Sequence, residues 1–218
     1  LNLRRLVPTE SGMEIIFQYS GRQFSIPLKV EGYFQAMNIL CAAGLAIASG
    51  SPSEKVFEHL KDLRPIPGRL EFCGLSKTEA KIYVDYAHTP DALTAALFSL
   101  RELTENKIIL VFGCGGGRDR FKRPIMGEIA ENFADGIIIT DDNPRNEDSD
   151  KIRKSILETC PSAVETPNRK EAIIKAINQG EKGDSILIAG KGHEKFQIIG
   201  DKKIPFSDQE IIREVIGN

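Results

Sequence analysis

The 218-residue sequence predicts an α/β protein whose larger, C-terminal part folds around a mostly parallel, doubly wound sheet. From residue 81 onward, runs rich in β-branched residues alternate with helical patterns, which is typical of right-handed βαβ units. Three of these runs end in polar or glycine-rich loops, as buried parallel strands do at the carboxyl edge of a sheet. The 41% hydrophobic and 28% charged residues are ordinary for a globular protein.

The first part of the chain has a different order of elements. Residues 13–19 and 22–30 read as two strands joined by a turn at Ser20-Gly21. Helices are expected at 33–49, which is rich in alanine, and at 51–63, which begins with a serine cap and a proline. The prolines and glycine of residues 64–69 then predict a stiff linker and a domain boundary.

The second part follows the βα alternation. Strands are expected at 81–85, 107–112, 136–140, 163–165 and 184–189. Helices are expected at 90–103, 122–133, 149–158, 169–178 and 207–216. Residues 196–206 read as a hairpin at the edge of the sheet.

Composition excludes several classes of function. The net charge of −2 and the pI near 6.0 disfavour binding to nucleic acid or to an anionic membrane. No apolar run approaches the length of a membrane span, and no signal-peptide pattern opens the chain. The four cysteines are far apart, which disfavours disulfides and zinc and favours reduced thiols in the cytoplasm. We expect a cytoplasmic monomer. Because Leu1 is not a methionine and a strand-like pattern begins at once, we also expect a piece of a longer chain.

The most informative loop is Asp142-Asn143-Pro144-Arg145, which follows the β-branched run Ile137-Ile138-Ile139. Pro144 restricts its own φ and biases Asn143 toward extended geometry. Arg145 offers a planar fork matched to a carboxylate or phosphate. A proline turn with a solvated arginine remains the alternative for these four residues alone.

Two further loops follow predicted strands. Residues 113–124 contain Gly115-Gly116-Gly117 before a helix, so their backbone amides could approach an anion. They lack the Gly-Lys-Ser/Thr ending of a Walker A loop and the GxGxxG spacing of a dinucleotide site. A glycine-rich turn with solvated basic residues explains them equally well. Residues 189–194 place Gly190, His193 and Glu194 after another strand, with no second histidine at the spacing of a zinc site.

Together the three loops supply two guanidinium groups, Arg118 and Arg145, and the carboxylate of Glu194, beside Asn143. This set suits a small zwitterion, so we expect an amino-acid pocket. A fourth segment, residues 84–91, ends a strand at Asp85, which could bind a ribose hydroxyl, with His88 near phosphate. The alternative is a helix cap at Asp85 or Thr89 and a surface histidine.

These segments, in this order, resemble the Mur ligases of peptidoglycan synthesis. The resemblance covers nearly the whole chain and is carried by five motifs: residues 32–38, 67–71, 85–90, 142–145 and 190–194. It implies that residues 1–69 end a central ATPase domain and that residues 70–218 form a C-terminal Rossmann-like domain. Gln35 departs from the family, in which asparagine is frequent at this position.

The resemblance also implies an activity. The sequence is similar to those family members that use ATP to form an acyl phosphate on UDP-N-acetylmuramoyl-L-alanyl-D-glutamate and then add meso-diaminopimelate. Diaminopimelate-binding residues are implied at Arg118, Asp142, Asn143, Arg145, Gly190 and Glu194. ATP contacts are implied at Asn38 for the adenine, at Asp85 for the ribose, and at Arg69 and His88 for the phosphates.

The resemblance implies ATP and Mg²⁺ as cofactors, but no metal ligand and no catalytic group are assigned in these residues. Because no Gly-Lys-Thr phosphate loop is present, we expect the 218 residues alone not to catalyse ligation. Two alternatives remain at this point: a non-catalytic amino-acid-binding module, and a lysine-adding or folate-type glutamate-adding ligase, which the Asp142–Arg145 loop disfavours.

Overall fold

The structure, a computed structural model, describes residues 1–9 and 12–217. The chain divides into two compact units, Leu1–Ile66 and Pro67–Asn218. The division falls inside the linker expected at residues 64–69, and it places residues 67–69 with the second unit. Each unit has its own hydrophobic core and is described by itself.

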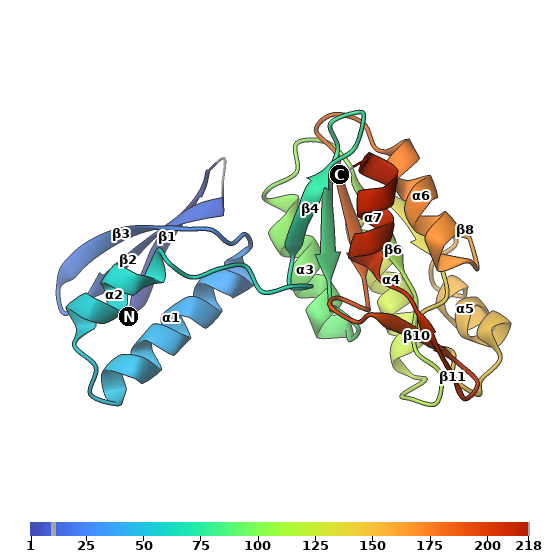
Figure 1. Cartoon of the computed structure of the whole chain (residues 1–218), viewed down its shortest axis with the longest axis horizontal. Helices are drawn as coiled ribbons and strands as arrows, with labels where there is room; N and C mark the ends of the chain where they lie inside the picture. Colours follow the sequence, from blue (N-terminus) through green and yellow to red (C-terminus); the bar gives the residue numbers. More distant parts are fainter. Residues whose placement is uncertain (10–11, 218) are drawn as a thin grey trace. The chain divides into compact units, whose positions relative to one another are not determined.

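The first unit is a three-stranded antiparallel sheet covered by two helices, drawn in blue to cyan in Figure 1. The strands are β1 (Asn2–Thr9), β2 (Gly12–Tyr19) and β3 (Arg22–Leu28), in that spatial order, and the helices are α1 (Tyr33–Ala48) and α2 (Ser53–Leu60). Both predicted strands and both predicted helices are present. Ser20 and Gly21 both have positive φ, 48° and 78°, as a two-residue hairpin turn requires.

Alternate residues of β2 form the core of this unit. Ile15 and Phe17 are fully buried, and Phe57 of α2 lies edge-on to Phe17 with ring centroids 5.1 Å apart. Offset and edge-to-face aromatic pairs of this kind stabilise a core beyond the area that they bury. The period-2 pattern of the strand and the aromatic residue of the helix therefore explain why this short sheet is covered on one face.

The second unit is a six-stranded sheet with the order β4-β5-β9-β6-β7-β8. Its strands are β4 (Glu71–Leu75), β5 (Lys81–Asp85), β6 (Ile108–Phe112), β7 (Gly136–Ile139), β8 (Val164–Glu165) and β9 (Ser185–Ala189). Only β4 is antiparallel to its neighbour, and the other five strands run parallel. The predicted mostly parallel, doubly wound fold is confirmed.

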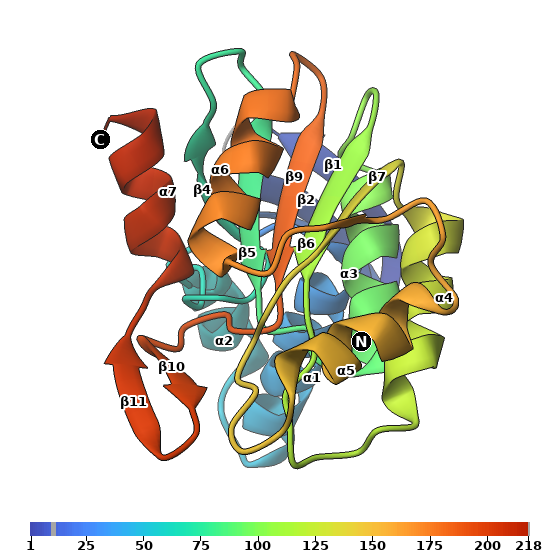
Figure 2. The same cartoon turned by 90° about the vertical axis from the view of Figure 1, so that its right-hand side faces the viewer.

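Helices cover both faces of this sheet (Figure 2). They are α3 (Pro90–Arg101), α4 (Lys122–Phe133), α5 (Ser149–Leu157), α6 (Arg169–Gln179) and α7 (Asp208–Ile216). Ile82, Val84 and Ile109 face α6 and α7, while α3 and α4 cover the other face and α5 packs beside α4. Because alternate residues are apolar on both faces, the strands read as continuous hydrophobic runs.

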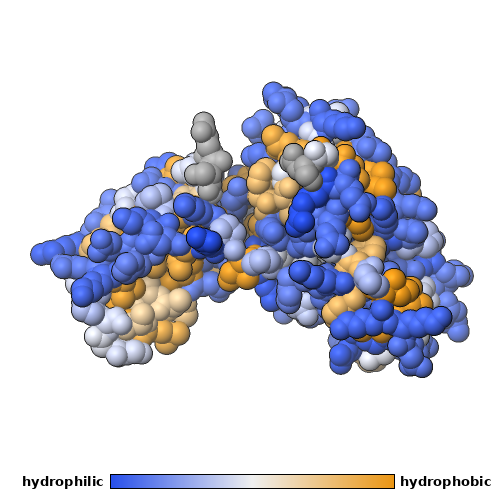
Figure 3. Space-filling model, in the orientation of Figure 1, coloured by the Kyte–Doolittle hydropathy of each residue, from blue (hydrophilic) through white to orange (hydrophobic). Residues whose placement is uncertain are grey.

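Two elements differ from the sequence-based expectations. β4 was not predicted, because it is short, contains Gly74 and directly follows the linker. The expected hairpin exists as β10 (Phe196–Ile199) and β11 (Lys202–Pro205), but it forms a separate two-stranded sheet, and β4 and β8 are the edges of the main one. β11 is exposed along its length, and Figure 3 shows hydrophilic residues beside hydrophobic ones in this region.

Candidate functional site

The loops after β5, β6, β7 and β9 meet at the carboxyl edge of the sheet, around a cavity of about 700 Å³. All of its lining residues belong to the second unit. Seven of the expected site residues line this cavity: His88, Arg118, Asp142, Asn143, Arg145, Gly190 and Glu194. Arg69 and Asp85 lie in the same unit but not on the cavity wall, and Asn38 is an exposed residue of α1 in the first unit.

Arg145, which lines this cavity, is held in a specific backbone conformation. Its φ is +53°, which is uncommon for a residue other than glycine. Its N–H donates to Ile198 O at 3.0 Å, and its carbonyl accepts from Gly200 N at 2.8 Å. Its Nη1 donates to Gly116 O at 2.9 Å, while Nε and Nη2 make no hydrogen bond within residues 1–9 and 12–217. Two donors of the guanidinium are therefore available to an anionic ligand.

Asn143, Lys191 and Glu194 form one hydrogen-bonded group on the cavity wall. Asn143 Nδ2 donates to Glu194 Oε2 at 2.9 Å, and Lys191 Nζ donates to Asn143 Oδ1 and to Glu194 Oε2, both at 3.0 Å. Partial burial raises the pKa of Glu194, but the hydrogen bonds from Asn143 and Lys191 and the charges of Lys191 and Arg145 outweigh it. The pKa of Glu194 therefore lies below its ordinary value, and Glu194 is a carboxylate at neutral pH.

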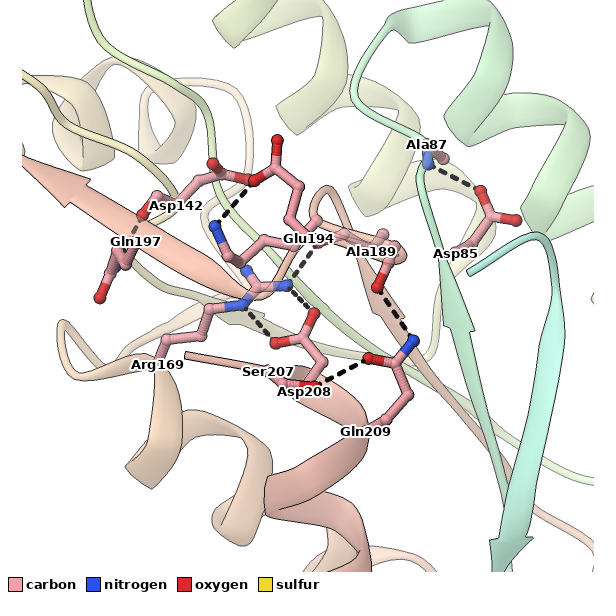
Figure 4. A network of polar contacts seen from close by, with 12 residues as sticks. Asp85, Ala87, Asp142, Arg169, Ala189, Glu194, Gln197, Ser207, Asp208 and Gln209 are labelled. Carbon is pink, nitrogen blue, oxygen red and sulfur yellow. Dashed lines mark hydrogen bonds and ion pairs between the residues drawn. The ribbon is translucent and has the colours of Figure 1, made fainter. Parts of the chain in front are cut away.

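A buried ionic network lies beneath this group (Figure 4). Arg169 is completely buried, and its Nε and Nη2 donate to the two carboxylate oxygens of Asp208, both at 2.8 Å. Nη2 also donates to Ala189 O at 2.9 Å. Burial raises the pKa of the Asp142 carboxyl, and the positive charges of Arg169 and Lys191 oppose this. Pairing of this kind is what makes buried charge tolerable.

Gly190 is required where the loop after β9 passes Asp142. Its φ is +112°, and a Cβ at this position would lie 2.7 Å from Asp142 Oδ2. Any side chain here would both strain the backbone and collide with the carboxylate. The close backbone approach that this glycine permits is therefore made toward the protein's own Asp142.

The glycine-rich loop after β6 packs on the loop after β7. A Cβ on Gly116 would lie 2.0 Å from Pro144 O, and the amide of Gly116 donates to Asn143 O at 2.9 Å. The amide of Gly117 donates to Glu147 Oε2 at 3.0 Å. These two amides, for which the sequence left open either an anion or a glycine-rich turn, are bonded to the protein. Among the residues that this loop presents to the cavity is Arg118, whose exposed guanidinium makes no hydrogen bond within the described residues.

Asp85, at the end of β5, has a structural role: it accepts hydrogen bonds from the backbone. The sequence had left open whether it does so. Asp85 is buried and accepts from Leu70 N at 2.6 Å and from Ala87 N at 2.7 Å. Burial raises the pKa of Asp85, and the two amide bonds act against this rise. Thr89, not Asp85, caps α3 through its side chain.

His88 and Arg69 both lie beside Tyr86. Nδ1 of His88 is 2.7 Å from Tyr86 O, so Nδ1 carries a proton and Nε2 is the nitrogen left for a ligand. The guanidinium of Arg69 stacks over the Tyr86 ring, 4.6 Å from its centroid. Tyr86 and His88 line the cavity, so this segment forms a second wall beside the charged group.

Three features of the site were not assigned from sequence. Lys191, which lies between two glycines, was given no role, and the ion pair of Arg123 and Glu147 was not recognised because its members are 24 positions apart. The contacts of the hairpin with the loop after β7 were also missed. Their only sequence signal is the hairpin's place directly after residues 189–194.

Neither a metal cluster nor a membrane span is found among residues 1–9 and 12–217. In this part of the chain, no three His, Cys, Asp or Glu side chains gather as a metal site would need. None of its helices combines the length and the apolar character required to cross a bilayer.

The fold and the cavity define a class of protein: a doubly wound α/β domain with a charged small-molecule site at the carboxyl edge of its sheet. The family described as Mur ligase, glutamate ligase domain matches residues 68–192. The chain belongs to this family.

Similar proteins support the assignment. Two UDP-N-acetylmuramoyl-L-alanyl-D-glutamate–2,6-diaminopimelate ligases match nearly the whole chain. The one from Chelativorans sp. (strain BNC1) is 46% identical over 99% of this chain and 45% of its own length. The one from Zymomonas mobilis is 48% identical over 97% of this chain and 45% of its own length. A solved structure of such a ligase has a TM-score of 0.71 and 33% identity, over 99% of this chain and 45% of the other. The chain thus spans about 45% of the length of these relatives.

Proposed function

We propose that this chain is part of an ATP-dependent amide ligase that adds meso-diaminopimelate to UDP-N-acetylmuramoyl-L-alanyl-D-glutamate. Ligases of this name are 44–48% identical to the chain over most of its length. The observation that carries the proposal is that Arg145 and Glu194 line the same cavity, close enough for the charge of Arg145 to lower the pKa of Glu194. A guanidinium and a carboxylate together match an α-amino-acid centre, which carries both a carboxylate and an ammonium.

The charged groups suit diaminopimelate better than lysine. Diaminopimelate differs from lysine by a carboxylate on its distal carbon, and Arg145 keeps two unbonded donors for such a group. The second hydrogen of Asn143 Nδ2 offers a further donor, because the first is given to Glu194. Lysine would leave the donors of the half-buried Arg145 and of the buried Asn143 without a partner, which weakens binding.

Four residues would contact the nucleotide. We assign Asn38 to the adenine, Asp85 to the ribose, and Arg69 and His88 to the phosphates. A ribose hydroxyl would donate to lone pairs of Asp85 that the two backbone amides leave over. In such a ligase ATP phosphorylates the glutamate γ-carboxylate to an acyl phosphate and leaves as ADP; the amine of diaminopimelate then attacks the acyl carbon, and inorganic phosphate is released as the amide forms. The described residues would act by orienting that amine and neutralising charge.

The test is a calorimetric titration of the chain with meso-diaminopimelate and with L-lysine. Saturable binding of diaminopimelate but not of lysine is expected, and Arg145→Ala should weaken it by about 10–100-fold, as the loss of charge-assisted bonds implies. Lys195→Ala, which changes an exposed residue of the loop between β9 and β10, is the matched control and should bind as the unaltered chain does. Equal binding of the two amino acids would contradict the proposed specificity.

A further inference from the structure

Lys191 is the feature of the site that the proposed function does not yet use. It lies in the loop directly after β9, and its side chain has no exposed surface. A buried ammonium is strongly unfavourable unless its donors are paired. Its partners, Asn143 and Glu194, both line the cavity, so this buried cation is bonded to groups that face a ligand rather than to the core.

The orientation of the Asn143 amide depends on Lys191. Its Oδ1 accepts from Lys191 Nζ at 3.0 Å and from Ile198 N at 2.9 Å. An ammonium and a backbone N–H are donors only, so they fix which end of the amide is the oxygen. The NH₂ group must then face Glu194 and the cavity. Without Lys191, one of the two constraints on this orientation is lost.

The charge of Glu194 depends on Lys191 as well. Glu194 Oε2 accepts from both Asn143 and Lys191, while Oε1 makes no hydrogen bond within the described residues and is left for a ligand. The charged groups around this carboxylate are Lys191, Arg145 and Arg169, which favour its ionised form, and Asp142, which opposes it. Lys191 is the only one of these four that is hydrogen-bonded to Glu194.

We propose that Lys191 is a positioning residue of the pocket, which holds Asn143 as a donor and Glu194 as an ionised acceptor. The pair then recognises adjacent carboxylate and ammonium groups of an amino acid: Nδ2 donates to the carboxylate, and Oε1 accepts from the ammonium. This role rests on the proposed function, since it concerns the same cavity. Lys191 itself touches no ligand and acts through its two neighbours.

Titration of the whole chain with meso-diaminopimelate between pH 5 and pH 8 tests this role. For the unaltered chain the dissociation constant should be nearly independent of pH, because Glu194 stays ionised. Lys191→Met removes a donor and a charge that lower the pKa of Glu194, so this pKa rises. The affinity should fall at least about tenfold at pH 7, and it should fall further as the pH decreases and Glu194 takes up a proton.

Two controls separate this role from a general loss of structure. Lys195→Met removes a lysine four positions away whose side chain is exposed, and it should keep the affinity and the flat pH profile. Lys191→Gln retains a donor but not the charge, so it should show the same pH dependence with a smaller loss at pH 8. If Lys191→Met does not fold, as judged by circular dichroism, Lys191→Gln provides the test.

The outcomes distinguish this role from the proposed function. If the unaltered chain binds no diaminopimelate, both the proposed function and the role of Lys191 are wrong. If the chain binds but the Lys191 variants bind equally well, or more weakly with a flat pH profile, only the positioning role is overturned. A new pH dependence confined to the two Lys191 variants supports it.

Discussion

Glu147 shows how single side chains hold the loops of the site in place. Its carboxylate accepts from Nη1 and Nη2 of Arg123 at 2.9 and 2.8 Å, and from the amide of Gly117 at 3.0 Å. It therefore joins the loop after β7 to the glycine-rich loop and to the first turn of α4. Arg123 is 3% exposed, so an unpaired charge would remain there if Glu147 were replaced.

This pair predicts a pH-dependent stability. The hydrogen bonds from Arg123 and Gly117 lower the pKa of Glu147 to about 2, from 4.5 in the unfolded chain. The carboxylate therefore stabilises the folded state above about pH 4.5, and this contribution is lost as the pH falls toward 2. Glu147→Gln should lower the free energy of unfolding by about 2 kcal/mol at pH 7, with a smaller difference from the unaltered chain at pH 3.

Urea unfolding at pH 7, 5, 4 and 3 measures this difference. Glu158→Gln, which removes the same charge from an exposed position after α5, should change the free energy by less than about 0.5 kcal/mol. A deficit of Glu147→Gln that stays constant from pH 7 to pH 3 would contradict the role assigned to the carboxylate.

For single residues, the sequence predicts which loops carry the site better than it predicts which side chains bond to one another. Asn143, Arg145 and Glu194 could be placed together because the carboxyl ends of parallel strands share one edge of a sheet. The partners Lys191 and Arg123 could not, because a lysine beside glycines or an arginine before a proline is most often solvated. Their burial results from packing between loops that are distant in sequence. Similarly, Gly116 is explained by the neighbouring carbonyl of Pro144, which the sequence does not reveal.

Among the elements, the β10–β11 hairpin has the closest connection to the site. It lies against the loop after β7: Ile198 N donates to Asn143 Oδ1 at 2.9 Å, and Gln197 Nε2 donates to Asp142 O at 2.6 Å. Ile199 also forms an isolated parallel bridge with Arg145. The sequence predicted the hairpin from its turn and alternation but placed it at the sheet edge. A local sequence pattern does not predict which other backbone segment a hairpin will contact.

This connection predicts that Ile198→Pro weakens ligand binding. Both backbone polar groups of Ile198 point to the loop after β7, so a proline there removes the bond to Asn143 without removing a bond between β10 and β11. The affinity for meso-diaminopimelate should fall about tenfold, the equivalent of one hydrogen bond. Calorimetric titration at pH 7 measures it.

Lys203→Pro is the matched control for this change. Lys203 is the residue of β11 directly opposite Ile198, and its side chain contributes only an exposed contact over the Phe196 ring. A proline here should leave the affinity within about twofold of the unaltered chain. Equal losses in the two variants would mean that the hairpin tolerates no proline, and the specific role of Ile198 would be wrong.

At the scale of the molecule, the pocket belongs to one unit. Every lining residue lies between Tyr86 and Glu194, and the unit that contains them, Pro67–Asn218, has its own core on both faces of the sheet. Residues 67–70 are part of this unit. Gly68 N donates to Glu71 Oε2 at 2.7 Å, and Leu70 N donates to Asp85. The linker therefore ends where these bonds begin, slightly before the boundary expected from its prolines.

We predict that residues 67–218, expressed alone, fold and bind meso-diaminopimelate within about threefold of the affinity of the whole chain. The reason is that no residue of the first unit lines the cavity. A second fragment, residues 71–218, lacks the Leu70 amide that pairs with the buried Asp85, and its free energy of unfolding should be lower by about 1–3 kcal/mol. Calorimetry measures the affinities and urea unfolding the stabilities. Failure of a folded 67–218 fragment to bind, while the whole chain binds, would show that the first unit completes the pocket.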